Sequence, residues 1–424
     1  MYRKIIDTFS TNVAGMILGL LVSILLARGL GPEGLGIRAF LFLFPGTLYI
    51  CLGINFFTSI IYFLRSGELS TERILTAGTV FFVLLTSLMY TVLFVVNQLW
   101  DFPFLYFLLI IIFLENATHF AGGMLLGTGN IILQNRLFLF KNLFFFLLVF
   151  SLYWLNNRVI SLGHVLALDA LSRLFYVAVG FMVFFTQTKC RPQIEFSVSV
   201  IRDLKKILSY SSYSYISNMC NYLNYRFDQW MIKIFLGDAS LGIYSVITTI
   251  SERFWLLPGA IAHVLFPEIA GMRKKQSFDK AIRSIDKMTI YTSLFGAFVW
   301  TSGFYLIKPV IVLLYGQAFS EVAILFQILF PGIILFSSVK IIAGFFAGLG
   351  RPDLRVKTAI LATVINVVLN LFFIPRYGLI GAAVATLFSY CFYGFSILWT
   401  YRLVRKEPER FLRIPLSEGY DDKP

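Results

Sequence analysis

The residues of this chain that could do chemistry are charged side chains placed inside long apolar runs. An ionisable group at bilayer depth is costly unless it faces water or a partner, so such residues mark functional sites. Six of them are basic and four acidic: Lys141, Arg173, Arg226, Lys233, Arg253, Lys340, Glu115, Asp169, Asp228 and Glu252. Because the basic groups outnumber the acidic ones, a cavity that they line would carry surplus positive charge and attract an anion.

The apolar run 210–235 is the richest in polar side chains. Two adjoining helical stripes along it carry amide, carboxylate, phenol and basic groups: Asn221, Asn224, Asp228, Tyr222, Arg226 and Lys233. Such a wall can hydrogen-bond sugar hydroxyls, stack on sugar rings and pair with phosphate. The alternative is that these groups pack against other helices as polar contacts. Arg226 and Lys233 exceed what packing needs, which favours a substrate cavity.

Four further residues are candidates for ion or proton coupling. Glu115 and His119 share one helix face and could relay protons, or could equally hydrogen-bond two helices together. Asp169 has Arg173 four residues later, a spacing that permits an intrahelical ion pair, and a purely structural pair is the favoured interpretation. Glu252 is the remaining candidate carboxylate.

Two further basic residues complete the set of candidate site residues. Lys340 stands in a run of apolar and small residues, which favours a cation that faces a cavity. Arg253 follows Glu252 directly, so the two side chains point in different directions and one of them is expected to face the cavity.

The elements that position these residues are membrane helices. Of 424 residues, 58% are apolar and 14% charged, and the mean hydropathy is +0.79, whereas a soluble domain is nearer half apolar and a quarter charged. Runs of spanning length predict an all-α integral membrane protein with twelve transmembrane helices. These are expected at 9–29, 37–64, 74–96, 104–126, 137–155, 161–186, 210–235, 242–267, 287–307, 321–347, 358–374 and 379–401.

The main pattern of the chain occurs twice. The segment LGPEGLGI starts at Leu30, and LGDASLGI starts at Leu236, 206 residues later. Each follows one long apolar run and precedes another. This indicates two parallel repeats of six helices, an arrangement typical of transporters whose substrate site lies at the repeat interface. The expected organisation is an N-lobe at 1–186, a basic linker at 187–209, a C-lobe at 210–401 and a partly disordered basic tail at 402–424.

The formal charge of +14 has a topological explanation rather than a nucleic-acid one. With the N-terminus in the cytoplasm, 25 of the 36 Lys and Arg residues fall in cytoplasmic segments. The outside segments and their margins hold five: Arg28, Arg38, Arg158, Lys308 and Arg376. This bias predicts that both termini are cytoplasmic, and no nucleic-acid partner is expected.

Several kinds of chemistry lack their sequence signatures. The chain contains no GxxxxGK[ST] or HExxH motif, and its three histidines lie far apart in the sequence. The four cysteines form no CxxC and lie in or beside apolar runs, which is typical of small core residues rather than disulfides. We therefore expect no catalytic residues, no metal site and no cofactor, and instead a secondary transporter that works by alternating access.

The segment LLARGLGPEGLGIRAF, the loop GLGRPDLR at 348–355 and NLFFIPRYGLIGAAVAT at 370–386 resemble polysaccharide-exporter flippases of the O-antigen translocase type. These belong to the multidrug/oligosaccharidyl-lipid/polysaccharide (MOP) flippase superfamily. The resemblance covers essentially the whole chain, and its motifs mark the superfamily better than the substrate. It implies two six-helix lobes around a central cationic cavity, and transport of undecaprenyl-diphosphate-linked oligosaccharide from the cytoplasmic to the periplasmic leaflet of the bacterial inner membrane.

On that resemblance the candidate residues receive roles. Arg226 and Lys233 would hold the diphosphate, aided by Lys340 and Arg253. The sugar path would be lined by Asn221, Asn224, Tyr222 and Asp228. The resemblance also implies a polysaccharide polymerase and a chain-length regulator as partners. An ion-coupled multidrug antiporter of the same superfamily and an O-antigen polymerase remain the alternative functions.

Overall fold

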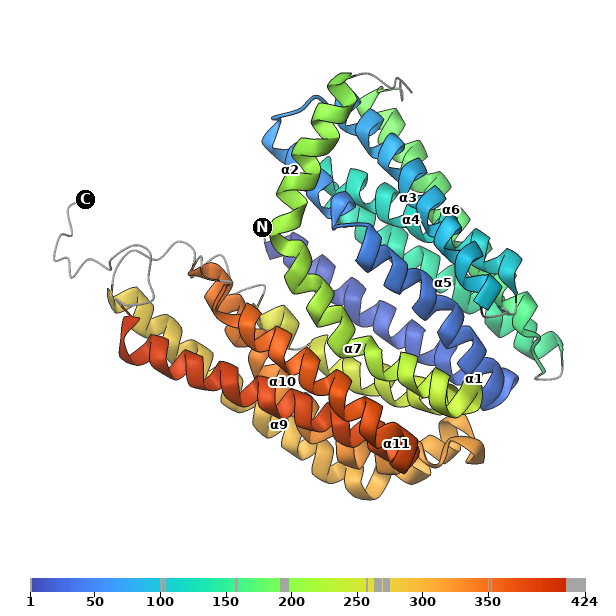
Figure 1. The fold of residues 1–424 in the computed structure, drawn as a ribbon, viewed down its shortest axis with the longest axis vertical. Helices are drawn as coiled ribbons and strands as arrows, with labels where there is room; N and C mark the ends of the chain where they lie inside the picture. Colours follow the sequence, from blue (N-terminus) through green and yellow to red (C-terminus); the bar gives the residue numbers. More distant parts are fainter. Residues whose placement is uncertain are drawn as a thin grey trace. The chain divides into compact units, whose positions relative to one another are not determined.

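A computed structural model describes residues 2–99, 102, 104–156, 159–190, 198–256, 258–262, 269, 275–349, 351 and 353–408 (Figure 1). Across these ranges the regular structure is helical. The helices are α1 (Tyr2–Leu52), α2 (Phe56–Ser66), α3 (Thr71–Leu99), α4 (Leu105–Gly127), α5 (Ile131–Leu155), α6 (Leu162–Thr188), α7 (Val198–Glu252), α9 (Lys275–Tyr315), α10 (Val322–Gly348) and α11 (Asp353–Lys406), with short 3₁₀ turns η1 (Arg253–Trp255) and η2 (Gln317–Phe319). Within this part of the chain nine helical segments are long and apolar enough to cross a membrane. The expected all-α membrane fold is confirmed, and the count of twelve spans stays a prediction.

Three of the longest helices bend sharply at a glycine. Gly31 in α1, Gly237 in α7 and Gly378 in α11 have φ angles of 68°, 84° and 58°, a left-handed conformation that glycine adopts without a Cβ clash. Each bend lies in the gap between two predicted spans, and Figure 1 shows α1 turning back on itself. Gly31 and Gly237 are separated by the same 206 residues as the two copies of the sequence pattern, so the repeat is one of geometry as well.

The predicted span 37–64 is not one helix. α1 ends at Leu52 and α2 begins at Phe56, because Ile54 and Asn55 adopt left-handed φ angles of 46° and 53°. The carbonyl of Cys51 at this break accepts a hydrogen bond of 2.5 Å from the Tyr215 hydroxyl of α7. A long-range donor therefore stabilises a break that the apolar pattern does not reveal.

Other predicted boundaries also shift. In the predicted span 242–267, α7 ends at Glu252 and the 3₁₀ turn η1 follows, while 263–268 lie outside the described residues. The basic segments expected as connections are largely helical: α7 begins at Val198 and α9 at Lys275. Helix propensity of Lys, Arg, Leu and Ile continues the helices past the apolar stretch that hydropathy detects. The tail residues from 409 onward lie outside the described residues.

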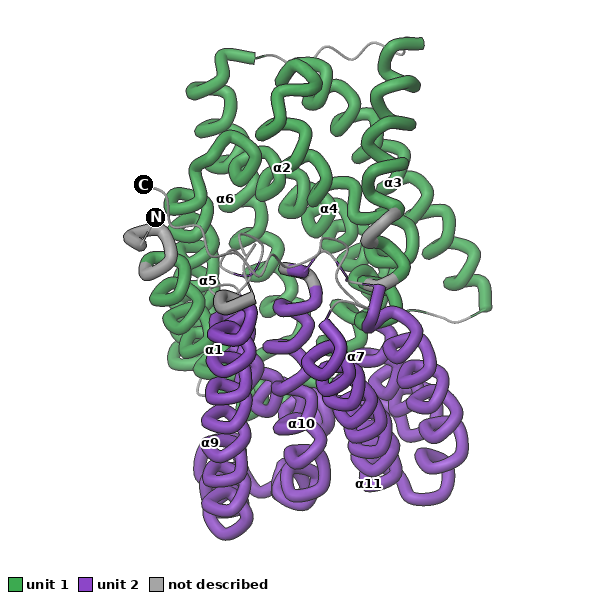
Figure 2. Tube along the Cα trace, turned by 90° about the vertical axis from the view of Figure 1, so that its left-hand side faces the viewer, with its two compact units in different colours: residues 1–222 green, residues 223–424 purple. Residues whose placement is uncertain are grey.

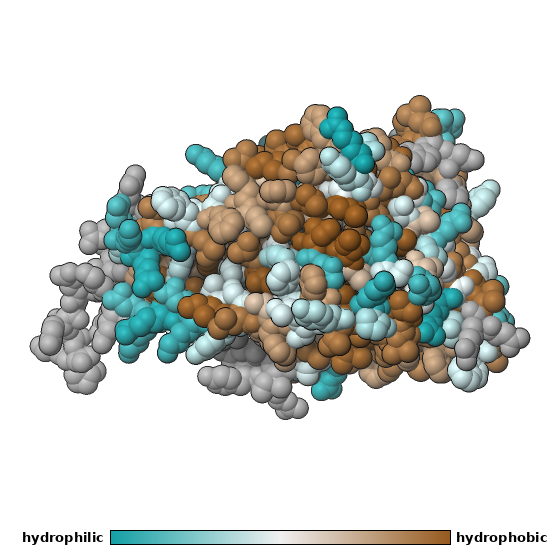
Figure 3. Space-filling view, turned by 90° about the horizontal axis from the view of Figure 1, so that it is seen from below, coloured by the Kyte–Doolittle hydropathy of each residue, from teal (hydrophilic) through white to brown (hydrophobic). Residues whose placement is uncertain are grey.

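The chain divides into two compact units, residues 1–222 and 223–424 (Figure 2). The division falls inside α7, and not in the segment 187–209 that we predicted as the linker. The predicted lobe boundaries stay a prediction. Large apolar side chains are exposed on both units, and apolar residues cover much of the face seen in Figure 3, as expected for surfaces that meet lipid.

Unit 1 contains α1 to α6 and the first half of α7. α1 packs on α5, α4 on α6, and α2 on α4, where Gly123 lets the helices approach: a Cβ there would lie 2.6 Å from the Phe57 carbonyl oxygen. Arg73 of α3 forms an ion pair with the buried Asp203 of α7, with Nε 2.8 Å from Oδ2. The first half of α7 is thus an integral part of this unit.

Unit 2 contains the second half of α7, α9, α10 and α11. α10 packs on both α9 and α11 and supplies much of the buried apolar core. α9 has few buried residues between Phe278 and Tyr315 and exposes large side chains such as Tyr291 and Leu294. α9 is therefore the helix of this unit with the most surface available to lipid.

Candidate functional site

The bend at Gly237 folds α7 into a hairpin that brings two predicted site residues together. Arg226 lies 11 residues before the bend and Glu252 lies 15 after it. The Arg226 guanidinium donates to both Glu252 carboxylate oxygens, with Nη1–Oε1 and Nη2–Oε2 distances of 2.8 and 3.1 Å. Arg226, predicted to bind diphosphate, is therefore held in a bidentate pair with a residue predicted to couple ions.

Asp228 is buried in a hydrogen-bonded network of unit 2. Its Oδ2 accepts from the Tyr244 hydroxyl at 2.6 Å and the Thr386 hydroxyl at 3.3 Å, and its Oδ1 accepts from the Gln229 backbone N–H at 2.7 Å. The side chain lines a cavity of about 10 Å³, the size of one water molecule at most. In this conformation Asp228 faces a closed pocket, not an open sugar path, because three donors from α7 and α11 surround it.

Asn224 is also buried, and its Oδ1 accepts a hydrogen bond of 3.0 Å from the Ser389 hydroxyl. The Ser389 hydroxyl also lies 2.9 Å from the Ala362 carbonyl oxygen, so its single hydrogen is shared between the two acceptors. Asn224 therefore joins α7 to α11, which corresponds to the packing alternative rather than to a surface that a sugar can reach.

Lys340 is surrounded by aromatic rings. Its Nζ lies 4.5 Å from the centroid of Trp255, 5.6 Å from that of Tyr225 and 5.9 Å from that of Phe336. Cation–π attraction keeps an ammonium charged without neutralising it. In the described part of the chain, no carboxylate lies within ion-pair distance of Lys340. The sequence did not point to these three rings, although Phe336 precedes Lys340 by one helical turn and could have been noticed.

The other two predicted cations differ from Lys340. Lys233 Nζ lies 2.5 Å from Asp238 Oδ1 and is mostly buried. Arg253 is half-buried in η1, directly after the helix that carries Glu252. The structure thus brings Arg226 and Glu252 together and places Lys340 beside the same helix through Tyr225, whereas Lys233 pairs separately near the bend.

Tyr222 and Asn221 belong to unit 1. The Tyr222 hydroxyl lies 3.1 Å from Thr47 Oγ1 of α1 and donates to the Leu43 carbonyl at 3.4 Å. Asn221 is half-buried. These two predicted sugar-path residues therefore occupy a different unit from the predicted diphosphate cations.

A second charged cluster lies within unit 1. Arg173 of α6 binds Asp169 through Nε–Oδ2 at 2.6 Å, and its Nη1 pairs with Glu115 of α4. His119 Nε2 lies 3.5 Å from Glu115 Oε1, and its ring stacks on Tyr49 with centroids 4.0 Å apart. The structure shows the predicted i, i+4 pair and adds a link between helices that spacing alone did not reveal.

Arg38 is a member of this cluster that the sequence analysis placed elsewhere. We assigned it to the outside margin, but it lies in the apolar segment of α1 with its Cζ 4.8 Å from the Phe42 ring. Arg173 Cζ lies 5.3 Å from the same ring, and Arg38 Nε is buried without a hydrogen-bond partner. Lys141 of α5 rests on Phe138 at 4.5 Å. Arg38 lies seven residues after the bend at Gly31, near the start of the predicted span 37–64, and its assignment to the outside margin stays a prediction.

These arrangements suit anion binding better than metal binding. The described residues contain no group of three or more His, Cys, Asp or Glu placed to hold a metal ion. The polar groups are held at fixed positions by neighbours within each unit, and Lys340 lies against three aromatic rings.

Comparison with solved structures defines the fold. The chain matches the lipid II flippase MurJ in an inward closed conformation with a TM-score of 0.73 and 14% identity, over 93% of this chain and 87% of that chain. It matches the inward-facing conformation of a multidrug resistance MATE family transporter of the MOP superfamily with a TM-score of 0.72 and 14% identity, over 96% and 99% of the two chains. At these identities the likeness concerns the fold alone.

Two curated relatives come from Haloferax volcanii. A probable low-salt glycan biosynthesis flippase is 24% identical over 53% of this chain and 47% of its own length. A probable flippase is 27% identical over 43% of this chain and 39% of its own length. The matched part of this chain therefore spans less than half of either relative.

Family membership rests on a longer match. The sequence pattern of the family described as "Polysaccharide biosynthesis protein" matches residues 25–324, which is most of the chain and includes both copies of the repeated motif. The helical fold and the solved structures agree with the superfamily that the motifs indicated. This chain belongs to the polysaccharide biosynthesis protein family.

Proposed function

We propose that this protein flips a lipid-linked oligosaccharide, with a diphosphate between lipid and sugar, from the cytoplasmic to the opposite leaflet of the membrane. The observation that supports this most directly is Lys340, a cation held inside unit 2 by three aromatic rings and not by a carboxylate. A diphosphate needs positive charge to enter the bilayer, and a cation that is already neutralised offers less of it.

The roles of the other cations are reordered accordingly. Lys340 makes the first contact with the diphosphate. Arg226 follows by exchanging one oxygen of Glu252 for a phosphate oxygen, since a guanidinium binds carboxylate and phosphate with the same fork geometry. Glu252, once released, becomes free to take up a proton or another cation, which would couple transport to an ion. Lys233 and Arg253 contribute to the positive field.

The family and the relatives named as flippases support this proposal, while its finer points are expectations. These are an undecaprenyl carrier, an O-antigen or similar repeat unit as cargo, the bacterial inner membrane, cytoplasmic termini, and a polymerase and chain-length regulator as partners. Unit 1, with Asn221 and Tyr222 near its boundary, would contribute to the sugar path. The protein acts as a transporter and not as an enzyme.

The test is flipping of a diphosphate-linked oligosaccharide in proteoliposomes. Lys340→Gln is expected to slow flipping by about tenfold or more, because one charge-assisted hydrogen bond to phosphate is lost. Lys340→Arg should keep most of the rate. Lys287→Gln is the matched control, because Lys287 is an exposed lysine of α9. Normal flipping by a stable Lys340→Gln protein would refute the proposed role of this residue.

Deletion of the gene tests the function as a whole. Units trapped on the cytoplasmic leaflet, with no surface polymer, are expected. Unpolymerised units on the outer leaflet would indicate a polymerase instead. Unchanged surface polysaccharide with altered drug resistance would indicate a multidrug antiporter.

A further inference from the structure

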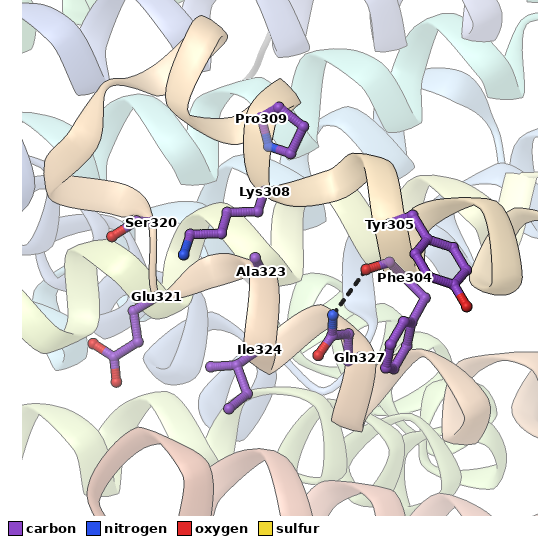
Figure 4. Close-up of a pocket in the computed structure, with 9 residues that line it drawn as sticks. All are labelled: Phe304, Tyr305, Lys308, Pro309, Ser320, Glu321, Ala323, Ile324 and Gln327. Carbon is purple, nitrogen blue, oxygen red and sulfur yellow. Dashed lines mark hydrogen bonds between the residues drawn. The ribbon is translucent and has the colours of Figure 1, made fainter.

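A cavity of about 560 Å³ lies in unit 2 where α9 approaches the start of α10 (Figure 4). This volume is in the range of small-molecule sites. Its walls carry Phe304, Tyr305, Lys308 and Pro309 of α9, and Ser320, Glu321, Ala323, Ile324 and Gln327 from the turn and from α10. None of these residues belongs to the charged clusters described above.

The charged residues of the cavity are one cation and one anion. Lys308 and Glu321 are both exposed, and across the residues that the structure describes neither has an ion-pair partner. Figure 4 shows the Lys308 ammonium reaching toward the side of the cavity where Ser320 and Glu321 lie. With Ser320 at the start of α10, the helix N-terminus adds partial positive charge beside the Lys308 ammonium. The cavity therefore offers adjacent positive and negative regions with a net charge of zero.

Pro309 adds a backbone acceptor to the cavity wall. Proline has no N–H, so the carbonyl of Tyr305, four residues earlier, lacks its usual helical donor. The preceding carbonyl, that of Phe304, accepts a hydrogen bond of 3.0 Å from Gln327 Nε2. The same proline thus leaves the Tyr305 carbonyl as a backbone acceptor that a ligand can use.

The cavity lies toward the C-terminal end of α9. Lys308 lies seven residues before the end of α9 at Tyr315, roughly 10 Å along the helix axis. The exposed side chains of Phe304, Tyr305 and Leu306 follow toward the interior. The cavity thus adjoins an exposed apolar surface near one end of a helix that is long enough to span a membrane.

We propose that this cavity binds a membrane phospholipid with a zwitterionic, primary-amine headgroup of the phosphoethanolamine type. The phosphate accepts hydrogen bonds from Lys308 Nζ and Ser320 Oγ at the N-terminus of α10. The ammonium donates to the Glu321 carboxylate and the Tyr305 carbonyl, and an acyl chain lies along Phe304. An anionic headgroup would place its net charge beside Glu321, and a choline headgroup has no N–H to donate.

The experiment is native mass spectrometry of the full-length protein in detergent, titrated with phosphatidylethanolamine, phosphatidylcholine and phosphatidylglycerol of identical acyl chains. The wild type is expected to bind the ethanolamine lipid most tightly. Lys308→Gln should weaken its binding by about tenfold. Glu321→Gln should remove the preference for the ethanolamine lipid over the glycerol lipid. These side chains are exposed, so the variants are expected to fold, and unchanged thermal unfolding verifies it.

Matched controls separate this site from general charge effects. Lys287→Gln removes an exposed lysine of the same helix, and Glu33→Gln removes an exposed glutamate of α1; both should bind lipids as the wild type does. Equal binding of all three lipids, or equal losses in the control variants, would overturn the proposal. Displacement of the lipid by millimolar inorganic phosphate would do so too, since it would indicate a free-phosphate site. None of these outcomes depends on whether the protein transports oligosaccharide.

Discussion

One intramembrane cation of unit 1, Arg173, and one of unit 2, Lys340, are held in different ways. In unit 1, Arg173 pairs with two carboxylates, those of Asp169 and Glu115, which come from two helices. In unit 2, Lys340 lies among the rings of Trp255, Tyr225 and Phe336. Carboxylates neutralise a cation and join helices, whereas aromatic rings lower the cost of burial and leave the charge available. We therefore expect the Arg173 cluster of unit 1 to be structural, and Lys340 to be the cation of unit 2 that is available to an anionic ligand.

The repeated motif shows how such a difference can arise on the same backbone. Applied to Arg38, the 206-residue offset leads to Tyr244, and both follow a bent glycine by seven residues. Arg38 adds a cation near Arg173, whereas Tyr244 donates a hydrogen bond to Asp228 at 2.6 Å. One position in the repeat thus supplies charge in unit 1 and a neutral donor in unit 2.

The largest expected effect comes from a substitution that breaks the charged cluster of unit 1. Arg173→Gln leaves Asp169 and Glu115 without their shared cation in a mostly buried site. We expect a loss of about 3–5 kcal/mol in the free energy of unfolding, because a buried charge is left uncompensated. Denaturant unfolding of the purified protein in detergent measures it.

Arg136→Gln is the control for this change. Arg136 is 60% exposed and its Nε lies 3.8 Å from Asp7 Oδ1, so its removal should cost less than about 1 kcal/mol. Adding Asp169→Asn and Glu115→Gln to Arg173→Gln should recover much of the loss. Equal stability of the Arg173 and Arg136 variants would contradict a structural role for the unit 1 cluster.

A smaller effect tests whether the pair in unit 2 is equally structural. Arg226→Gln and Glu252→Gln should each lower the free energy of unfolding by about 1.5–3 kcal/mol, since each removes a charge-assisted pair. The double variant should lose less than the sum of the two. A double-mutant cycle measured by denaturant unfolding gives the coupling energy. Additive losses would mean that the two side chains do not stabilise each other.

The smallest expected effect tests whether the aromatic rings around Lys340 attract its charge. Trp255→Phe keeps an aromatic ring but weakens the cation–π attraction at 4.5 Å, so a cycle with Lys340→Met should give a coupling of about 0.5–1 kcal/mol. Thermal and denaturant unfolding of the four proteins provide the cycle. Zero coupling would show that the rings pack around Lys340 without attracting its charge. Arg173 and Lys340 would then differ only in how exposed their side chains are.

Much of the fold could be predicted from the sequence, because membrane helices can be recognised by their length and hydropathy. The glycine bends at Gly31 and Gly237 also follow from the repeated motif. The break at Ile54 and Asn55 could not be predicted, since its donor, Tyr215, is far away in the sequence. The pattern of apolar residues indicates which segments span the membrane. It does not indicate which backbone carbonyl needs a hydrogen-bond donor from a distant part of the sequence.

The candidate site was predicted less completely than the fold. Spacing within one helix suggested the Asp169–Arg173 pair, which the structure shows. Spacing could not reveal that Glu252 would reach Arg226 across a hairpin or that Trp255 would cover Lys340. Contacts between helices depend on packing geometry, and single-sequence periodicity carries no information about it.

The hydrogen bond from Tyr215 to the Cys51 carbonyl also implies an order in which the parts of unit 1 can assemble during synthesis. The acceptor is made 164 residues before its donor, and the α3 residue Arg73 likewise waits for Asp203. Ribosomal synthesis delivers the N-terminal part first. Unit 1 can therefore insert its helices early but cannot complete its interior until the first half of α7 has emerged. A nascent chain that ends before Val198 still lacks the Tyr215 hydroxyl that satisfies the Cys51 carbonyl at the end of α1.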